Sequence, residues 1–155
     1  LKVGNMSITG IAKNINLNGE IEILYNKKIQ SFSMGEILKE RIIVGINENY
    51  NSHLAILKFQ KLGYDVIGVY LCPLKKNKIE YSYEKEIEKF SKNSKIKFEK
   101  IQIENDINDI LLFENLYYIA KKYNTSYIST GHKITISSSI MTFISKNNLT
   151  FISPF

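Results

Sequence analysis

The stretch RIIVGINENYNSHLAILKFQKLGYDVIGVYLC, residues 41–72, decides the fold. Its first apolar run, residues 42–46, is short and rich in β-branched side chains, which is typical of a buried strand. Apolar residues then recur at helical spacing up to Gly63, a residue suited to end a helix. A second apolar run covers residues 66–71. Strand, helix and strand in this length predict a right-handed βαβ unit with parallel strands.

The polar loop at residues 47–52, with the sequence NENYNS, is the first place to look for a ligand. Asn51 or Ser52 is suited to cap the helix that follows. In a βαβ unit this loop meets the positive end of the helix, where anions and nucleotides bind. The alternative is an ordinary turn with a helix cap, and the sequence leaves both interpretations open.

The rest of the chain continues to alternate between strand and helix patterns. Strands are expected at residues 97–103, 126–129 and 149–152, and helices at residues 82–91, 106–123 and 136–145. From residue 41 to residue 155 this alternation predicts a doubly wound α/β domain with a parallel sheet.

Residues 1–40 show a different pattern, with three short strands separated by turn residues. The strands are expected at residues 6–12, 19–25 and 28–32. Several short strands in so few residues predict a small SH3-like β-barrel. We therefore expect two domains, a β domain at residues 1–40 and an α/β domain at residues 41–155.

Composition excludes several classes of protein. The single cysteine, Cys72, excludes an internal disulfide and a cysteine-only metal site, and with only two histidines we expect no metal centre. We expect Cys72 to be a small buried apolar residue. No apolar stretch reaches the roughly 20 residues that span a bilayer, and no signal peptide is evident, so we expect a cytoplasmic protein without a membrane partner. Because the sequence begins at Leu1, we expect a fragment or a processed chain.

The net charge of +6 is compatible with a nucleic-acid partner such as tRNA. Lys75, Lys76 and Lys78 follow the second predicted strand and are candidates for contacts with RNA phosphates. A solvated lysine loop is the alternative interpretation, because a general enrichment in lysine gives the same charge.

Residues 1–40 resemble the small C-terminal domain of biotin-protein ligases. The resemblance rests on the order and spacing of GIA at residues 10–12, NGEI at residues 18–21 and SMGEI at residues 33–37. Met34 departs from the family's closing SGE motif. Because the ligase's catalytic domain is absent, biotin transfer is not implied for this chain. The alternative is a small barrel with ordinary turn glycines.

The α/β part resembles the PP-loop family of ATP pyrophosphatases, and most closely the tRNA 2-thiouridylases. The resemblance rests on GYDVIGV at residues 63–69 and STGH at residues 129–132, which is similar to the family's ATGH. It implies an adenine-nucleotide hydrolase-like fold, ATP and magnesium as cofactors, and tRNA as a partner.

The family's phosphate loop, SGGxDS, is altered here. Asn47 replaces the first serine, Glu48 and Asn49 replace the two glycines, Asn51 replaces the aspartate, and Ser52 is kept. In the family the glycines let backbone N–H groups surround the pyrophosphate, which requires the absence of Cβ atoms. Glu48 is expected to repel a phosphate, and Asn51 lacks the charge that the family places near magnesium.

We assign no catalytic residue, because the thiouridylases' cysteine pair is also missing. The positions that the resemblance marks for nucleotide binding are Asn47, Glu48, Asn49, Asn51, Ser52, Val69, Gly131 and His132. A structural or solvent-facing role is the alternative for His132.

Three functional hypotheses follow. The first is a degenerate PP-loop domain that binds nucleotide or tRNA, or serves a tRNA-modifying assembly with other subunits, without catalysing adenylation. The second is an active ATP-dependent tRNA sulfurtransferase that takes its cysteines from elsewhere. The third is a non-catalytic interaction module. The loss of the SGGxDS loop favours the first hypothesis.

Overall fold

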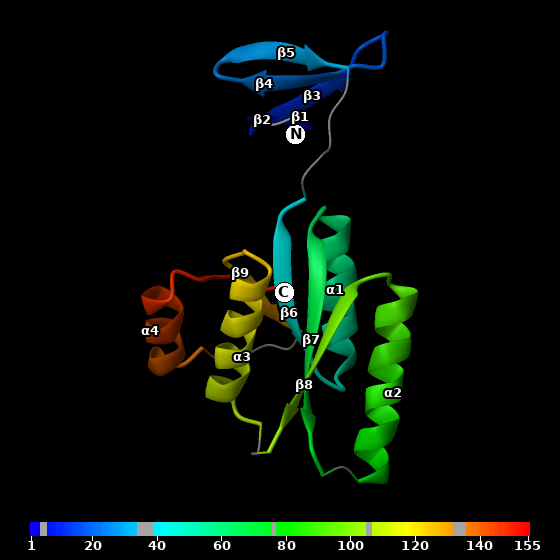
Figure 1. The fold of residues 1–155 in the computed structure, drawn as a ribbon, viewed down its shortest axis with the longest axis vertical. Coiled ribbons are helices and arrows are strands. Elements are labelled where there is room, and N and C mark those ends of the chain that lie inside the picture. The colour runs from blue at the N-terminus through cyan, green and yellow to red at the C-terminus, as the bar shows by residue number, and fades with distance from the viewer. Residues whose placement is uncertain (4–5, 34–38, 76, 105–106, 132–135) are drawn as a thin grey trace. The chain divides into compact units, whose positions relative to one another are not determined.

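The computed structural model describes residues 1–3, 6–33, 39–75, 77–104, 107–131 and 136–155. The chain divides into two compact units, Leu1–Lys39 and Glu40–Phe155. Figure 1 shows the elements of both units.

The larger unit is built on one five-stranded sheet with the order β10-β9-β6-β7-β8, in which every pair of neighbours is parallel. The strands are β6 (Arg41–Ile46), β7 (Asp65–Pro73), β8 (Lys97–Ile103), β9 (Tyr127–Thr130) and β10 (Thr150–Phe151). The helices are α1 (Tyr50–Lys61), α2 (Lys78–Asn93), α3 (Asp109–Lys122) and α4 (Ser138–Lys146). The α/β class and the parallel sheet predicted from the sequence are confirmed.

Two apolar cores cover the two faces of this sheet. Ile42, Val44 and Ile46 of β6 pack with the buried residues of α1 and α2. Ile43 faces the other way and packs with α3 and α4, and Figure 1 shows these two helix layers on either side of the sheet. A strand with helices on both faces must be apolar on both, which explains the unbroken apolar run of β6.

Asparagine caps three of the four helices in this unit. Asn49, Asn77 and Asn108 accept hydrogen bonds from the first backbone N–H groups of α1, α2 and α3. The sequence-based choice of Asn51 or Ser52 as the cap of α1 is wrong, since α1 begins at Tyr50. The predicted start near Ser82 is also wrong, because a capping box at Asn77 starts α2 earlier.

The end of β9 packs against the start of α1. Gly131 donates its backbone N–H to the carbonyl oxygen of Gly45 at 3.1 Å. A Cβ atom on Gly131 would lie 2.2 Å from the Cα of Ser52, so the absence of a side chain permits this approach. The contact brings the end of β9 next to the loop that follows β6.

The N-terminal unit contains a three-stranded antiparallel sheet with the order β3-β4-β5. Its strands are β3 (Ile11–Ile15), β4 (Ile21–Tyr25) and β5 (Lys28–Phe32), and the two-residue strands β1 (Lys2–Val3) and β2 (Met6–Ser7) form a separate pair. Asn26 and Lys27 both have positive φ, as a tight two-residue hairpin requires.

The structure does not confirm the predicted SH3-like barrel, because its described residues form an open three-stranded sheet and a short separate ladder. Residues 34–37 of the SMGEI motif lie outside the described residues. The resemblance to biotin-protein ligases therefore stays a prediction. In the part of the chain that the structure describes, we find no helix with the length and apolar character that crossing a bilayer requires.

We expect Gly131→Ala to lower the free energy of unfolding by about 3 kcal/mol, because the new methyl group meets backbone that has no room to yield. Gly63→Ala is the matched control. Gly63 has a φ of +92°, but no heavy atom lies within 4 Å of the point that a Cβ atom would occupy, so its cost is backbone strain of about 1 kcal/mol. Urea denaturation of both variants measures the difference, and equal losses would contradict the steric explanation.

Candidate functional site

The topology of the sheet places a candidate site at the carboxyl end of β6. The chain continues from β6 to β7 and β8 on one side, whereas β9 and β10 lie on the other side. In an open parallel sheet, ligands bind in the crevice at the point where the strand order reverses. The loop after β6 and the end of β9 meet there through Gly131 and Gly45.

A cavity of about 470 Å³ opens at this edge on the β7 side of β6. The ends of β6 and β7 and the starts of α2 and α3 line it, and its described lining contains no residue of β9. Its size suits a small organic ligand. The apolar and aromatic lining residues are Ile46, Tyr70, Leu71, Pro73, Tyr83, Ile107 and Leu112. The polar lining residues are Asn47, Glu48, Glu80, Asn108 and Asp109, and Gly45 completes the lining.

Asn47 and Ser52 form a closed pair across the loop. The Ser52 hydroxyl donates to Asn47 Oδ1 at 2.6 Å and accepts a hydrogen bond from the Asn47 backbone N–H at 3.2 Å. Asn47 Oδ1 also accepts from the backbone N–H of Asn49 at 3.0 Å. Because Ser52 is fully buried, its hydrogen bonds with Asn47 attach the loop to the interior of the protein.

Asn49 closes the second half of the loop. Its side chain accepts from the Asn51 backbone N–H at 3.0 Å, and its carbonyl oxygen accepts from the Ser52 backbone N–H at 2.9 Å. The backbone N–H groups of Asn47, Asn49, Asn51 and Ser52 are therefore all engaged within the loop. A phosphate group that used these four N–H groups would have to displace their hydrogen bonds.

The structure brings some of the predicted nucleotide-binding positions together. Asn47 and Glu48 line the cavity, while Asn49 and Asn51 are exposed beside it. Ser52 and Gly131 pack against each other behind the loop.

The remaining predicted positions are more scattered. Val69 is fully buried in the core beneath α3, and the next two residues of β7, Tyr70 and Leu71, line the cavity. Lys75 and Lys78 are exposed near the start of α2. His132 and Lys76 lie outside the described residues.

The sequence did not predict that residues of α2 and α3 line this cavity. Glu80 and Tyr83 come from α2, and Asn108 and Asp109 come from the start of α3. One signal was present in the sequence: an asparagine followed by an aspartate after a strand is typical of a helix start at the carboxyl edge of a parallel sheet.

The cavity is acidic. Glu48, Glu80 and Asp109 line it, and its described lining contains no lysine, arginine or histidine. One carboxylate oxygen of Glu80 is used by the capping box, where it accepts the Asn77 backbone N–H at 2.8 Å. Among the described residues, no group of three or more acidic, histidine or cysteine side chains is arranged to hold a metal ion.

Cys72 is fully buried, as the sequence predicted. Its thiol lies 3.6 Å from a carboxylate oxygen of Glu84, whose other oxygen accepts a hydrogen bond from Lys100 at 2.7 Å. Burial keeps Cys72 from acting as an exposed sulfur carrier.

His53, in the first turn of α1, is a packing residue between α1 and α2. Its ring stacks on Phe90 with the centroids 4.0 Å apart. In the described part of the chain its Nε2 atom is buried without a hydrogen-bond partner. Burial lowers the pKa of His53 from its usual 6.5, and Glu86 opposes this shift.

We expect Ser52→Ala to destabilise the protein by about 1–2 kcal/mol, because it removes the hydroxyl that both donates to and accepts from Asn47. Asn51→Ala is the control, since the Asn51 side chain is exposed on the same helical turn and we expect a change within about 0.5 kcal/mol. Thermal unfolding followed by circular dichroism measures both. Equal stability of the two variants would show that the Asn47–Ser52 pair does not fix the loop.

The lowered pKa of His53 predicts a pH dependence of stability. As pH falls below about 6.5, the unfolded chain takes up a proton at this residue before the folded protein does. The contribution of neutral His53 to stability is thus complete above that pH and is lost as pH falls through the lower pKa of the folded state. We expect His53→Phe, which keeps the stacking on Phe90, to flatten this slope in denaturation experiments between about pH 8 and pH 5. An unchanged slope would exclude His53 as its source.

This chain matches known proteins in its structure but not in its sequence. No protein-family model matches it, and no curated protein matches its sequence. A predicted subunit of a tRNA methyltransferase from Methanocaldococcus jannaschii aligns with a TM-score of 0.51 and 17% identity, over 74% of this chain and 67% of the other.

Two further solved structures align over the same share of this chain. A universal stress protein family member from Burkholderia pseudomallei has a TM-score of 0.44 and 11% identity, with 94% of its own length covered. PH1313 from Pyrococcus horikoshii Ot3 has a TM-score of 0.47 and 19% identity, with 35% of its length covered. At such low identities, the similarity to the Methanocaldococcus protein shows a shared α/β fold and nothing finer.

Proposed function

We propose that the α/β unit is a degenerate PP-loop domain that binds the nucleoside part of a nucleotide or of RNA without catalysing adenylation. The shared fold, the reversal of strand order at β6 and the cavity beside it support the location of the site. The motifs at residues 63–69 and 129–132 support the relation to the PP-loop family.

The observation that carries this proposal is the closed loop at residues 47–52. Four of its backbone N–H groups donate to Asn47, Asn49 or Ser52, where an active enzyme of the family leaves such groups to the pyrophosphate. Each displaced hydrogen bond costs on the order of 1 kcal/mol. Glu48 adds a negative charge next to the place that a phosphate would occupy.

The cavity nevertheless keeps the features of a site for a base and a sugar. Its wall is apolar at Ile46, Leu71 and Leu112. Aromatic surface comes from Tyr70 and Tyr83. Asn47 and Asn108 add amide groups for hydrogen bonds. Such a mixture of apolar wall and few polar groups is typical of small-molecule sites.

A role beside tRNA is supported by the position of two exposed lysines. Lys75 follows β7 and Lys78 begins α2, so both lie near the edge of the sheet where the cavity opens. They suit contacts with RNA phosphates while the cavity holds a nucleoside. The name of the Methanocaldococcus protein, a predicted subunit of a tRNA methyltransferase, agrees with a role in an assembly that handles tRNA.

The competing hypothesis of an active sulfurtransferase gains no support from the site. Cys72 is the single cysteine of the sequence, and it is fully buried against Glu84. A persulfide carrier requires an exposed thiolate.

Opening the loop tests the proposal. We expect wild-type protein to release no AMP or pyrophosphate from ATP and to bind magnesium-ATP weakly in calorimetry. Glu48→Gly combined with Asn49→Gly removes one charge and the side chain that accepts from the Asn51 N–H, and we expect about tenfold tighter ATP binding. Glycine at a helix cap costs only a few tenths of a kcal/mol, so α1 is expected to remain folded.

Asn124→Gly is the control for added glycine, since Asn124 has a φ of 52° and follows α3 at the amino edge of the sheet. We expect it to bind ATP like the wild type. Release of AMP and pyrophosphate by the wild type would overturn the proposal in favour of an active enzyme. An ATP affinity that does not respond to the double variant would exclude the Glu48 charge and the Asn49 side chain as the obstacle.

A further inference from the structure

We infer that this cavity selects ligands that are uncharged or positively charged where a nucleotide carries its phosphates. Among the ligands of the proposed function, we therefore expect a nucleoside that carries no 5′-phosphate, or one with an amino group at that position, to bind more tightly than a nucleoside 5′-phosphate. This inference rests on the proposed function, because it takes the cavity to be a nucleoside site.

The first line of evidence is the charge of the cavity wall. Glu48 follows β6, Glu80 lies in α2 and Asp109 lies in α3, and these three separate segments place carboxylates on one cavity. The described lining residues carry no positive charge, and the exposed Lys75 and Lys78 lie near the same edge of the sheet but outside the lining. Glu48 and Asp109 are exposed and Glu80 is half-buried, so water screens part of their charge, but all three act in the same direction on an anion in the cavity.

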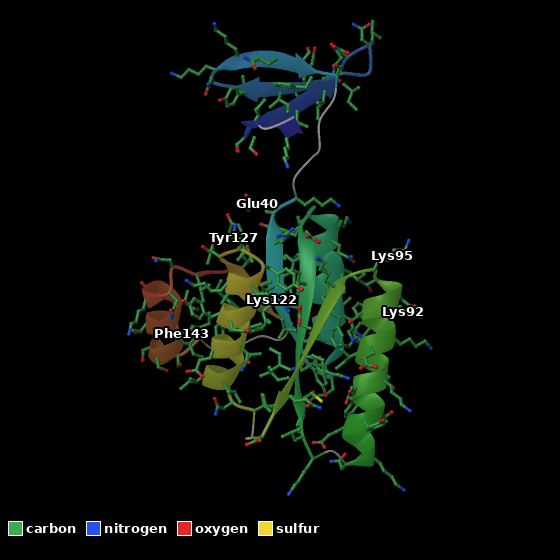
Figure 2. All side chains as sticks on the ribbon, in the orientation of Figure 1. Glu40, Lys92, Lys95, Lys122, Tyr127 and Phe143 are labelled. Carbon is green, nitrogen blue, oxygen red and sulfur yellow. The ribbon has the colours of Figure 1, made fainter. Side chains whose placement is uncertain are left out.

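The acidity is local, since the whole chain carries a net charge of +6. Figure 2 shows Lys92 and Lys95 at the end of α2 opposite to Glu80, and Lys122 at the end of α3 opposite to Asp109. Lys122 is also paired with Glu99 at 2.8 Å. Along α3 the charges are separated, with Asp109 at the cavity and Lys122 at the far end, whereas α2 begins with Lys78 and carries both signs along its length.

The second line of evidence is that the nearby helix ends are already compensated. Helix N-termini attract anions through free N–H groups and the positive end of the helix dipole. Asn49, Asn77 and Asn108 accept hydrogen bonds from these N–H groups in α1, α2 and α3. Glu80 and Asp109 add negative charge to the first turns of α2 and α3. Part of what would attract a phosphate is therefore already satisfied from within the protein: the caps accept from Asn51, Ile79, Glu80 and Leu111, and two of the first turns carry a carboxylate.

The same groups suit a different ligand. Carboxylates accept hydrogen bonds from sugar hydroxyls and amino groups, and they attract a cation. Tyr70 and Tyr83 offer aromatic surface to a base. A nucleoside satisfies both parts of the wall without placing a phosphate among the carboxylates.

Three ligands that differ only at the 5′ position test this inference: adenosine, adenosine 5′-monophosphate and 5′-amino-5′-deoxyadenosine. Calorimetry at about pH 7 without magnesium compares their affinities for the whole chain. We expect the monophosphate to bind about tenfold more weakly than adenosine, and the amino compound to bind more tightly than adenosine.

Charge-neutral variants test whether the carboxylates cause the preference for adenosine over its monophosphate. In Glu48→Gln and Asp109→Asn, we expect the ratio of adenosine affinity to monophosphate affinity to fall about threefold each. Glu114→Gln is the control, because Glu114 is exposed on α3 and does not line the cavity, and we expect the wild-type ratio. Glu80 is left unchanged because its carboxylate caps α2.

The outcomes separate the two proposals. A monophosphate that binds as tightly as adenosine, or a ratio that the variants leave unchanged, would overturn the inference and leave the nucleoside site standing. If none of the three ligands binds at millimolar concentration, the nucleoside site itself is excluded, and the inference falls with it.

Discussion

The parallel pairing of β6 on both sides is the constraint on which the α/β unit depends. β6 is paired with β7 from Arg41 to Ile46 and with β9 from Ile43 to Gly45. A strand in this position has no face or edge left for water, so residues 42–46 are buried. Because the neighbouring strands run the same way, their carboxyl ends share one edge of the sheet. The helices that follow must then begin at that edge, and the cavity lies among their first turns.

The N–H groups of the loop after β6 can be used in two ways, to bind an anion or to bind side chains of the protein itself. A helix start leaves N–H groups free, and either a bound anion or the protein's own side chains can satisfy them. Here Asn47, Asn49 and Ser52 satisfy them. Asn49, which replaces a glycine, and Asn47, which replaces a serine, thus fix the helix start in the absence of a ligand, and they occupy N–H groups that a pyrophosphate would otherwise bind. Glu48 acts in the same direction through its charge.

The sequence predicted the parts of the structure that depend on local pattern. The apolar runs at residues 42–46 and 66–71 specify β6 and β7, and the pattern at residues 106–123 locates α3 within three residues at its start. The cap of α1 was misplaced because Asn49, Asn51 and Ser52 are all good capping residues. Only the extended backbone at Asn49 distinguishes the true cap.

The sequence predicted the cavity residues that follow β6 but not those that come from α2 and α3. Asn47 and Glu48 follow directly from the strand–loop–helix pattern. Glu80 and Asp109 come from segments far along the chain, and their approach depends on how α2 and α3 pack on the two faces of the sheet. The expected barrel at residues 1–40 required strands to close around a core. The short strands and turns were visible in the sequence, but closure depends on long-range pairing that local alternation does not specify.

A nuclear magnetic resonance titration of ¹⁵N-labelled protein tests directly whether a closed loop lies beside a nucleoside cavity. Adenosine and magnesium-ATP are each added while the backbone amide shifts are followed. We expect adenosine to shift the amides of Ile46, Tyr70 and Leu71, which line the cavity. We expect ATP to leave the amides of Asn49, Asn51 and Ser52 in place, since these already donate within the loop. Large downfield shifts of the loop amides with ATP would show that they bind phosphate and that the loop is not closed.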